Sequence, residues 1–216
     1  SERVQSKVEV GLATLKNLQH PLVVTPTGTF LATPNEELFK NHEGMRDRGG
    51  LQFLDNMEDI ATIRGEGYTI VFFSYQWLSW THKGPNVVQR EWMDSGVRHY
   101  LQYSAIPVER IFVWLDILAI PQINREVQKL AVDSLYVYAS AVDALIIIAP
   151  DSMHEQTQEQ AGLQSYKSRV WTRVEQVSHC SAHGCSQTRG CSHCSAHGIG
   201  STFGSTFDHE RTIPYP

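Results

Sequence analysis

The stretch Tyr68–Trp80, YTIVFFSYQWLSW, decides the fold of this 216-residue chain. At its centre, Ile70–Phe73 is an unbroken run of β-branched and aromatic residues, and polar Ser74 follows it. A short apolar run without alternation between apolar and polar residues is typical of a strand that is buried on both faces of a parallel sheet. We therefore predict a central strand here, with polar residues at its carboxyl end.

Two further runs of the same kind follow, RIFVWL at Arg110–Leu115 and ALIIIA at Ala144–Ala149. A segment of helical periodicity lies in each gap between consecutive runs, and Asn86 is placed to cap the first of these segments. This alternation predicts an α/β fold with an open parallel sheet. Ligands of such sheets lie beyond the carboxyl ends of the strands. The candidate site residues there are Ser74, Tyr75, Gln76, Trp77 and Asp116.

The composition narrows the class of protein. At 41% hydrophobic residues the chain can bury a core, and its net charge of −5 offers nucleic acids and anionic membranes no electrostatic attraction. The sequence has no run of about 18 apolar residues, so we expect no membrane span. All four cysteines lie between Cys180 and Cys194, unlike those of a secreted disulfide scaffold, and we expect a cytoplasmic protein. The chain starts without an initiator Met, which predicts a fragment or a processed form.

Residues 1–66 are expected to form a leader or linker that carries no chemistry. Leu22–Val24 and Thr29–Leu31 flank a Pro-Thr-Gly turn signal and predict a small hairpin. Asn41–Gly50 holds charges of both signs and predicts a polar loop, whereas Leu51–Ile63 has apolar residues at helical spacing and predicts a short helix. We expect this leader to pack against the main domain or to link it to other parts of the protein.

The C-terminal part of the chain consists of three segments that differ in composition and periodicity. Residues 151–165 are polar and predict a mobile loop, and Arg169–Val177 has the periodicity of a short helix. From Ser178 onward the composition changes, because SHCSAHG occurs twice and STF is repeated. With almost no aliphatic side chains, residues 178–216 form a low-complexity tail that we expect to be disordered.

The cysteines of this tail are weak candidates for metal ligands. They are Cys180, Cys185, Cys191 and Cys194. Cys191 and Cys194 have the C-x-x-C spacing of zinc ligands, but only five residues separate Cys185 from Cys191, too few for the usual zinc ribbon or finger. The 14-residue duplication also accounts for the clustering of His and Cys. We therefore expect no resident metal, with a zinc-binding tail module as the alternative.

The three apolar runs and the segment after them resemble a Toll/interleukin-receptor (TIR) domain. VFFSY at Val71–Tyr75 is similar to the opening box of that family, and FVWLD at Phe112–Asp116 is similar to its second strand. Trp171 and Glu175 have the spacing of the family's S-x-W-x-x-x-E pattern, with Ser168 one residue further back. The order and spacing of the three boxes together carry the resemblance.

The resemblance implies a flavodoxin-like, three-layer α/β domain with an open parallel sheet over residues 67–177. The chain departs from the family pattern where Thr172 stands in place of the usual Cys and where the loop after Asp116 lacks a glycine. Trp77 and Trp80 are additional tryptophans after the first strand. These departures indicate a divergent branch of the TIR family. The low-complexity tail predicts a domain that is truncated at its C-terminus.

The resemblance also implies two functions. Some TIR domains cleave NAD at the nicotinamide–ribose bond, which would make NAD a substrate rather than a cofactor and Glu175 the catalytic carboxylate. A carboxylate suits this step because it stabilises the positive charge that develops on the ribose. Other TIR domains are non-catalytic and act in signalling or innate immunity by assembling with themselves or with other TIR domains.

Each candidate residue also has a structural interpretation. Glu175 is either catalytic or an exposed charge beside two arginines of the same helix. Trp171 either anchors the core or binds substrate. Asp116 either contacts substrate or braces the loop that follows it. Trp77 and Trp80 either pack beneath a loop or stack on the adenine ring.

Overall fold

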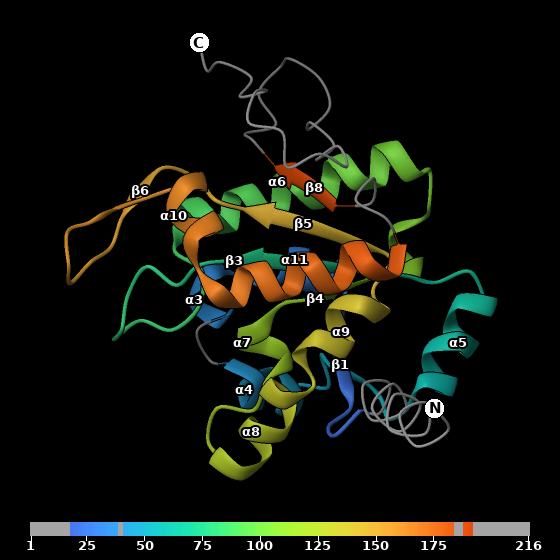
Figure 1. Ribbon diagram of the computed structural model, residues 1–216. Coiled ribbons are helices and arrows are strands. Elements are labelled where there is room, and N and C mark those ends of the chain that lie inside the picture. Colours follow the sequence, from blue (N-terminus) through green and yellow to red (C-terminus); the bar gives the residue numbers. More distant parts are fainter. Residues whose placement is uncertain (1–17, 39–40, 184–187, 192–216) are drawn as a thin grey trace, which may run out of the picture.

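The computed structural model describes residues 18–38, 41–183 and 188–191. A central sheet with helices on both of its faces forms the fold (Figure 1). Its six strands are ordered β2-β1-β4-β3-β5-β8. Their bounds are β1 (Leu22–Pro26), β2 (Gln52–Leu54), β3 (Thr69–Tyr75), β4 (Ile111–Trp114), β5 (Ala144–Ile148) and β8 (Thr188–Cys191).

The helices and a small hairpin connect these strands. The elements before β4 are α2 (Thr27–Ala32), α3 (Asn35–Leu38), α4 (Asn41–Asp47), α5 (Met57–Gly65), α6 (Val87–Ser104) and the 3-10 turn η1 (Val108–Arg110). After β4 come α7 (Asp116–Ala119), α8 (Arg125–Asp133), α9 (Leu135–Ala141), β6 (Ser152–Met153), β7 (Gln160–Ala161), α10 (Leu163–Ser168) and α11 (Val170–His183). Strands β6 and β7 pair antiparallel in a separate sheet of their own.

The order of the parallel strands creates a switch point at β3. Strands β4, β3, β5 and β8 are parallel neighbours, while β1 is antiparallel to both β4 and β2. Strand β3, the first of the parallel strands along the chain, therefore lies between β4 and β5, which are the second and the third. Ser74 pairs with Ile147 and Tyr75 with Ile148 at the carboxyl end of this central pair. Ligands of open α/β sheets bind at such an edge, where the connections leave in opposite directions.

Alternation along β3 divides the core into two layers. The ring of Phe72 is stacked on that of Trp114, with 4.0 Å between the ring centroids, in the layer covered by α9 and α11. Phe73 faces the other layer, where it meets Phe30 of α2 and the buried Met93 of α6. Successive strand residues point to opposite faces, so the side chains at the carboxyl end of β3 lie in both layers.

The three predicted strands and the mixed α/β class are confirmed. The first predicted helix is confirmed as well, and Asn86 caps it in a reciprocal pair with Gln89: the Asn86 side chain accepts the backbone N–H of Gln89, and the Gln89 side chain accepts that of Asn86. Such a capping box satisfies two backbone donors that the first turn of a helix would otherwise leave unpaired.

The expectations for the first 66 residues need correction. Residues Leu22–Pro26 are a strand, but their partners are β2 and β4, whereas Thr29–Leu31 lies in α2. The predicted loop Asn41–Gly50 contains α4. The predicted helix Leu51–Ile63 holds a strand, β2, before α5 begins at Met57. This segment therefore supplies one edge of the main sheet.

The C-terminal boundaries also differ from those expected. The predicted loop 151–165 contains the β6–β7 hairpin and the start of α10. The helix predicted to end at Val177 continues as α11 to His183, and β8 then pairs with β5. Residues 184–187 and 192–216 of the predicted tail lie outside the described residues. Within the described parts of the chain, none of the helices is both long enough and apolar enough to cross a bilayer.

Candidate functional site

A buried chain of hydroxyl groups leads to an acid side chain at the carboxyl end of β3. The Ser74 hydroxyl donates a hydrogen bond to Glu175 Oε2, and its oxygen lies 2.5 Å from the Tyr166 hydroxyl oxygen. Tyr166 belongs to α10 and Glu175 to α11, so three elements meet at this point. With the Tyr166 hydroxyl donating to Ser74, the three groups form a directed relay that ends on the Glu175 carboxyl.

Helix α11 presents a polar rather than an apolar face to the domain. Its buried residues, Thr172, Glu175 and His179, recur at helical spacing on one side. Hydrogen bonds hold this face, because Thr172 Oγ1 donates to the Tyr166 carbonyl over 2.6 Å, and His179 Nδ1 lies 3.0 Å from the Ala139 carbonyl oxygen. Glu175 is thus directed inward by the partners of its neighbours on the helix.

Glu175 is a buried acid that keeps its proton. Only 9% of its surface is exposed, and burial raises the pKa of its carboxyl to about 8. The hydrogen bond from Ser74 lowers this pKa, whereas the nearby charge of Asp116 raises it. At pH 7 the protonated form therefore predominates.

Asp116 lies on the other side of β3 in a different environment. Its Oδ1 accepts hydrogen bonds from the Tyr75 hydroxyl and the Ile117 backbone N–H, both over 2.6 Å, and its Oδ2 accepts the indole N–H of Trp77 over 2.8 Å. Burial raises the pKa of Asp116, and these three donors oppose that effect. Burial also raises the pKa of the Tyr75 hydroxyl well above its usual value.

Gln76 joins the strand exit to helices on both sides. Its side-chain Nε2 donates to Ser165 Oγ of α10 over 2.9 Å. Its backbone carbonyl accepts Nε2 of Gln89, at the start of α6, also over 2.9 Å. The position of the strand exit is therefore fixed from both layers.

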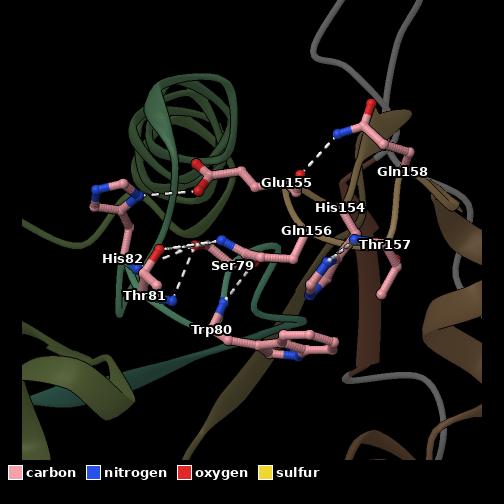
Figure 2. A network of polar contacts seen from close by, with 9 residues as sticks. All are labelled: Ser79, Trp80, Thr81, His82, His154, Glu155, Gln156, Thr157 and Gln158. Carbon is pink, nitrogen blue, oxygen red and sulfur yellow. Dashed lines mark hydrogen bonds and ion pairs between the residues drawn. The ribbon is translucent and has the colours of Figure 1, made fainter.

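Two loops beyond the carboxyl ends of β3 and β5 are tied together by polar contacts (Figure 2). We call the contacts between residues 79–82 and 154–158 the two-loop network. Gln156 is at its centre: its Oε1 accepts the Trp80 backbone N–H over 2.9 Å, and its Nε2 donates to the hydroxyls of Ser79 and Thr81. His82 Nδ1 and Glu155 Oε2 are 2.9 Å apart, and this contact lowers the pKa of Glu155. The loops are thus held to each other rather than lying separately.

The site residues predicted from the sequence fall into two groups at the carboxyl end of β3 and a third group, two tryptophans, outside it. Most of them gather at the strand exit, Ser74 and Glu175 on the α11 side and Tyr75, Trp77 and Asp116 on the other. The interpretation of Glu175 as an exposed charge is wrong, since it is buried.

Two of the tryptophans lie outside this cluster. Trp171 is 52% exposed on α11, so it is not a core anchor. Trp80 is 70% exposed and lies beside His154, with ring centroids 5.1 Å apart, rather than packing beneath a loop. The indole rings of Trp171 and Trp80 are therefore both exposed to solvent.

The sequence interpretation missed two residues of the site, Tyr166 and Ser165. Both lie in α10, which follows a polar stretch without helical periodicity. The only available signal was an aromatic residue within a polar segment, and that signal does not indicate which partner the hydroxyl will find. Their role depends on the β6–β7 hairpin, which brings the chain back to the exit of β3.

The four cysteines that are candidate metal ligands lie only partly within the described residues. Cys180 is a half-buried residue of α11, and Cys191 lies in β8. Cys185 and Cys194 lie outside the described residues. Among the residues that the structure does describe, no three His, Cys, Asp or Glu side chains are grouped so as to hold a metal ion.

Comparison with known proteins gives no family assignment. No protein-family model, no curated protein and no solved structure matches the chain.

Proposed function

We propose that the chain is a flavodoxin-like, TIR-like signalling or defence domain that cleaves NAD at the nicotinamide–ribose bond, with Glu175 as the catalytic carboxylate. The observation that carries the proposal is the hydrogen bond between Ser74 and the buried Glu175 at the switch point of the sheet. The strand order also supports it, because the parallel strands follow the flavodoxin-like sequence of second, first, third and fourth. A strongly shifted pKa at such an edge is typical of functional acids.

The chemistry requires the ionised form of Glu175. When the bond between the ribose C1′ and the pyridinium nitrogen breaks, nicotinamide takes the bonding electrons and leaves as a neutral molecule. No acid is needed for departure, but positive charge develops on the ribose, and a carboxylate beside it stabilises that charge. Water then adds to C1′ and releases a proton. Because the pKa of Glu175 is about 8, the reaction should become faster as the pH rises toward that value.

The surrounding residues have distinct roles in this proposal. Ser74 stabilises the carboxylate by donating its hydrogen bond, and Tyr166 orients the Ser74 hydroxyl. Trp171 lies one helical turn before Glu175 and is half exposed, so its indole can contact a substrate ring. Gln76 and Trp77 leave the same strand end and would contact the ribose or the nicotinamide, while Asp116 contributes a second carboxyl group.

The test is nicotinamide release from NAD by the wild type and by Glu175→Gln. The amide keeps the shape of the side chain but cannot carry the negative charge, so we expect release to fall at least about 100-fold. Glu126→Gln, which changes an exposed glutamate of α8, is the matched control and should release nicotinamide at the wild-type rate. In the wild type, the rate should rise about tenfold per pH unit below pH 8 and then level off. Equal release by both glutamine variants, with both folded, would refute the proposal.

A second candidate function is self-association without catalysis. The observation that favours it is the apolar outer surface of α11, where Val170 is 76%, Trp171 52% and Val177 59% exposed. Large apolar side chains gathered on one helix are typical of a surface that another protein covers. Val177→Lys should then lower the sedimentation coefficient at high protein concentration while leaving nicotinamide release unchanged. A monomeric wild type would exclude this candidate.

A further inference from the structure

Trp80, in the two-loop network, is the most exposed of the five tryptophans of the chain, with 70% of its surface accessible. It takes no part in the hydrogen bonds of Ser74, Glu175 or Asp116 described above. Tryptophan is on average a highly buried residue, and its large rigid ring is enriched where proteins meet other molecules. An indole held at the surface is therefore a candidate binding group.

The backbone on which this indole stands is fixed by contacts between the two loops. The Trp80 backbone N–H donates to Gln156 Oε1 over 2.9 Å, and the Glu155 backbone N–H donates to the Leu78 carbonyl over 2.8 Å. Neither of these contacts involves the indole. The position of the ring is thus set in advance, and replacing the side chain leaves the attachment of the loops intact.

His154 orients the indole without covering it. The two ring centroids are 5.1 Å apart and the ring planes are inclined by 60°. His154 is held in turn, because its Nδ1 accepts the Thr157 backbone N–H over 3.3 Å, and Figure 2 shows its ring between that backbone and the indole. A ring inclined in this way does not cover an indole face as a stacked ring would. A flat molecule can therefore reach the indole from solvent.

The place of Trp80 in the fold connects it with the candidate active site. Both loops of the network follow strands of the central parallel pair, β3 and β5, and lie at the edge where open α/β sheets bind ligands. Trp80 follows Ser74 by six residues, and Ser74 is bonded to Glu175. Six residues span at most about 22 Å. The length of an extended dinucleotide falls within this limit.

We propose that the indole of Trp80 is the stacking site for the adenine ring of NAD, with the two-loop network and His154 holding the indole in place. This inference rests on the proposed function, since Glu175 acts on the nicotinamide end of the same molecule. Stacking suits adenine because a base presents a flat π-face to an indole without needing a charged partner. Trp80 then determines the affinity for NAD and takes no part in bond cleavage.

Steady-state nicotinamide release separates affinity from chemistry. Trp80→Ala should raise the KM for NAD about tenfold and leave kcat unchanged, because stacking on one base is worth roughly 5- to 150-fold in affinity. With nicotinamide mononucleotide, which lacks adenine, this variant and the wild type should have the same KM. Trp80→Phe keeps a ring and should recover most of the affinity. Ile123→Ala, which shortens an apolar side chain that is 76% exposed, is the matched control and should behave as the wild type.

Adenosine and ribose test the site without cleavage, because both are uncharged and only adenosine carries the ring. Each would be titrated into the isotopically labelled full chain while NMR follows the Trp80 indole N–H and the Thr157 amide. We expect saturable shifts of both signals with adenosine and none with ribose, and no shift of the Thr157 amide in Trp80→Ala.

The outcomes separate the adenine site from the proposed reaction. Saturable adenosine binding without any nicotinamide release would support the site at Trp80 and refute cleavage at Glu175. Signals that do not move with adenosine, or that ribose moves equally, would overturn the adenine site. An unchanged KM for NAD in a Trp80→Ala variant that still releases nicotinamide would also overturn it.

Discussion

At the scale of single residues, the two acids at the carboxyl end of β3 differ in their hydrogen-bond partners, although burial raises the pKa of both. Asp116 accepts three hydrogen bonds, from a phenol, an indole and a backbone N–H. For Glu175, the hydrogen bond that opposes the effect of burial comes from Ser74 alone, and its pKa rises to about 8. Burial thus raises the pKa of both carboxyl groups in this region, and the two differ in how many hydrogen-bond donors oppose that effect.

The raised pKa of Glu175 predicts how the stability of the fold depends on pH. The carboxyl titrates near 4.5 in the unfolded chain and near 8 in the folded chain, so between these values the folded state binds more protons. The free energy of unfolding should therefore fall as the pH rises through this window, by up to about 1.4 kcal/mol per pH unit. Glu175→Gln cannot titrate and should lose this dependence.

Urea unfolding at pH 5.5 and pH 7.5 would measure the effect in wild type, Glu175→Gln and the control Glu126→Gln. The control should keep the wild-type dependence, because its side chain is exposed. An identical pH dependence in all three proteins would contradict the placement of Glu175 in the core.

At the scale of elements, the strands could be predicted and the short helices could not. Strands β3, β4 and β5 are unbroken apolar runs, and such runs carry their own signal. Helices α2 and α4 have six and seven residues, too few for a periodicity to be recognised. Tertiary contacts hold them instead: Thr27 Oγ1 donates to the Ile111 carbonyl over 2.6 Å, and His42 Nδ1 lies 2.9 Å from the Leu118 carbonyl oxygen.

The candidate site was predictable only in part for a related reason. The prediction of a parallel sheet, in which the carboxyl ends of all strands share one edge, places Ser74 and Asp116 at that edge from sequence alone. The burial of Glu175 was not predictable, because neighbouring Arg169 and Arg173 are exposed and suggest an exposed helix face. Its inward direction depends on contacts of Tyr166 in a segment without periodicity.

The two-loop network predicts a local rather than a global effect of mutation. Gln156→Ala removes three hydrogen bonds that join the loops, and should lower the free energy of unfolding by about 1 kcal/mol. It should also make residues 79–82 more accessible to protease, because, of the hydrogen bonds described for these loops, only those through Glu155 would still join this loop to the β6–β7 hairpin. Limited proteolysis followed by mass spectrometry would locate the cleavage.

Gln158→Ala is the control for this experiment. Gln158 lies in the same loop, but its side chain donates only to the Glu155 carbonyl and does not reach the other loop. Its cleavage pattern should match that of the wild type. If Gln156→Ala and Gln158→Ala are cut equally, Gln156 does not join the loops in solution.

At the scale of the whole molecule, the described part of the first 66 residues contributes two strands, β1 and β2, to the main sheet. Strand β1 pairs with β4 and with β2, and Phe30 and Met45 from the same segment are buried in the core beneath α6. A chain of residues 67–191 would lose both strands and expose the edge of β4, and we expect it not to fold cooperatively.

A truncated chain of residues 18–191 is the matched comparison, because it keeps all six strands of the sheet. Near-UV circular dichroism and urea unfolding should show fixed packing and a single transition for this chain and neither for residues 67–191. Cooperative unfolding of the shorter chain would mean that β1 and β2 are accessory to the fold.

The alternation along β3 gives the strand a property like that of a reading frame. Ser74 and Tyr75 are adjacent, yet they serve acids on opposite sides of the sheet. Adding one residue after Phe73 would exchange the two frames, turning Tyr75 toward Glu175 and Ser74 toward Asp116. Adding two residues would restore the frame and only lengthen the exit. Changes in chain length at this point should therefore be tolerated in steps of two, and homologues that differ there would be expected to differ by even numbers.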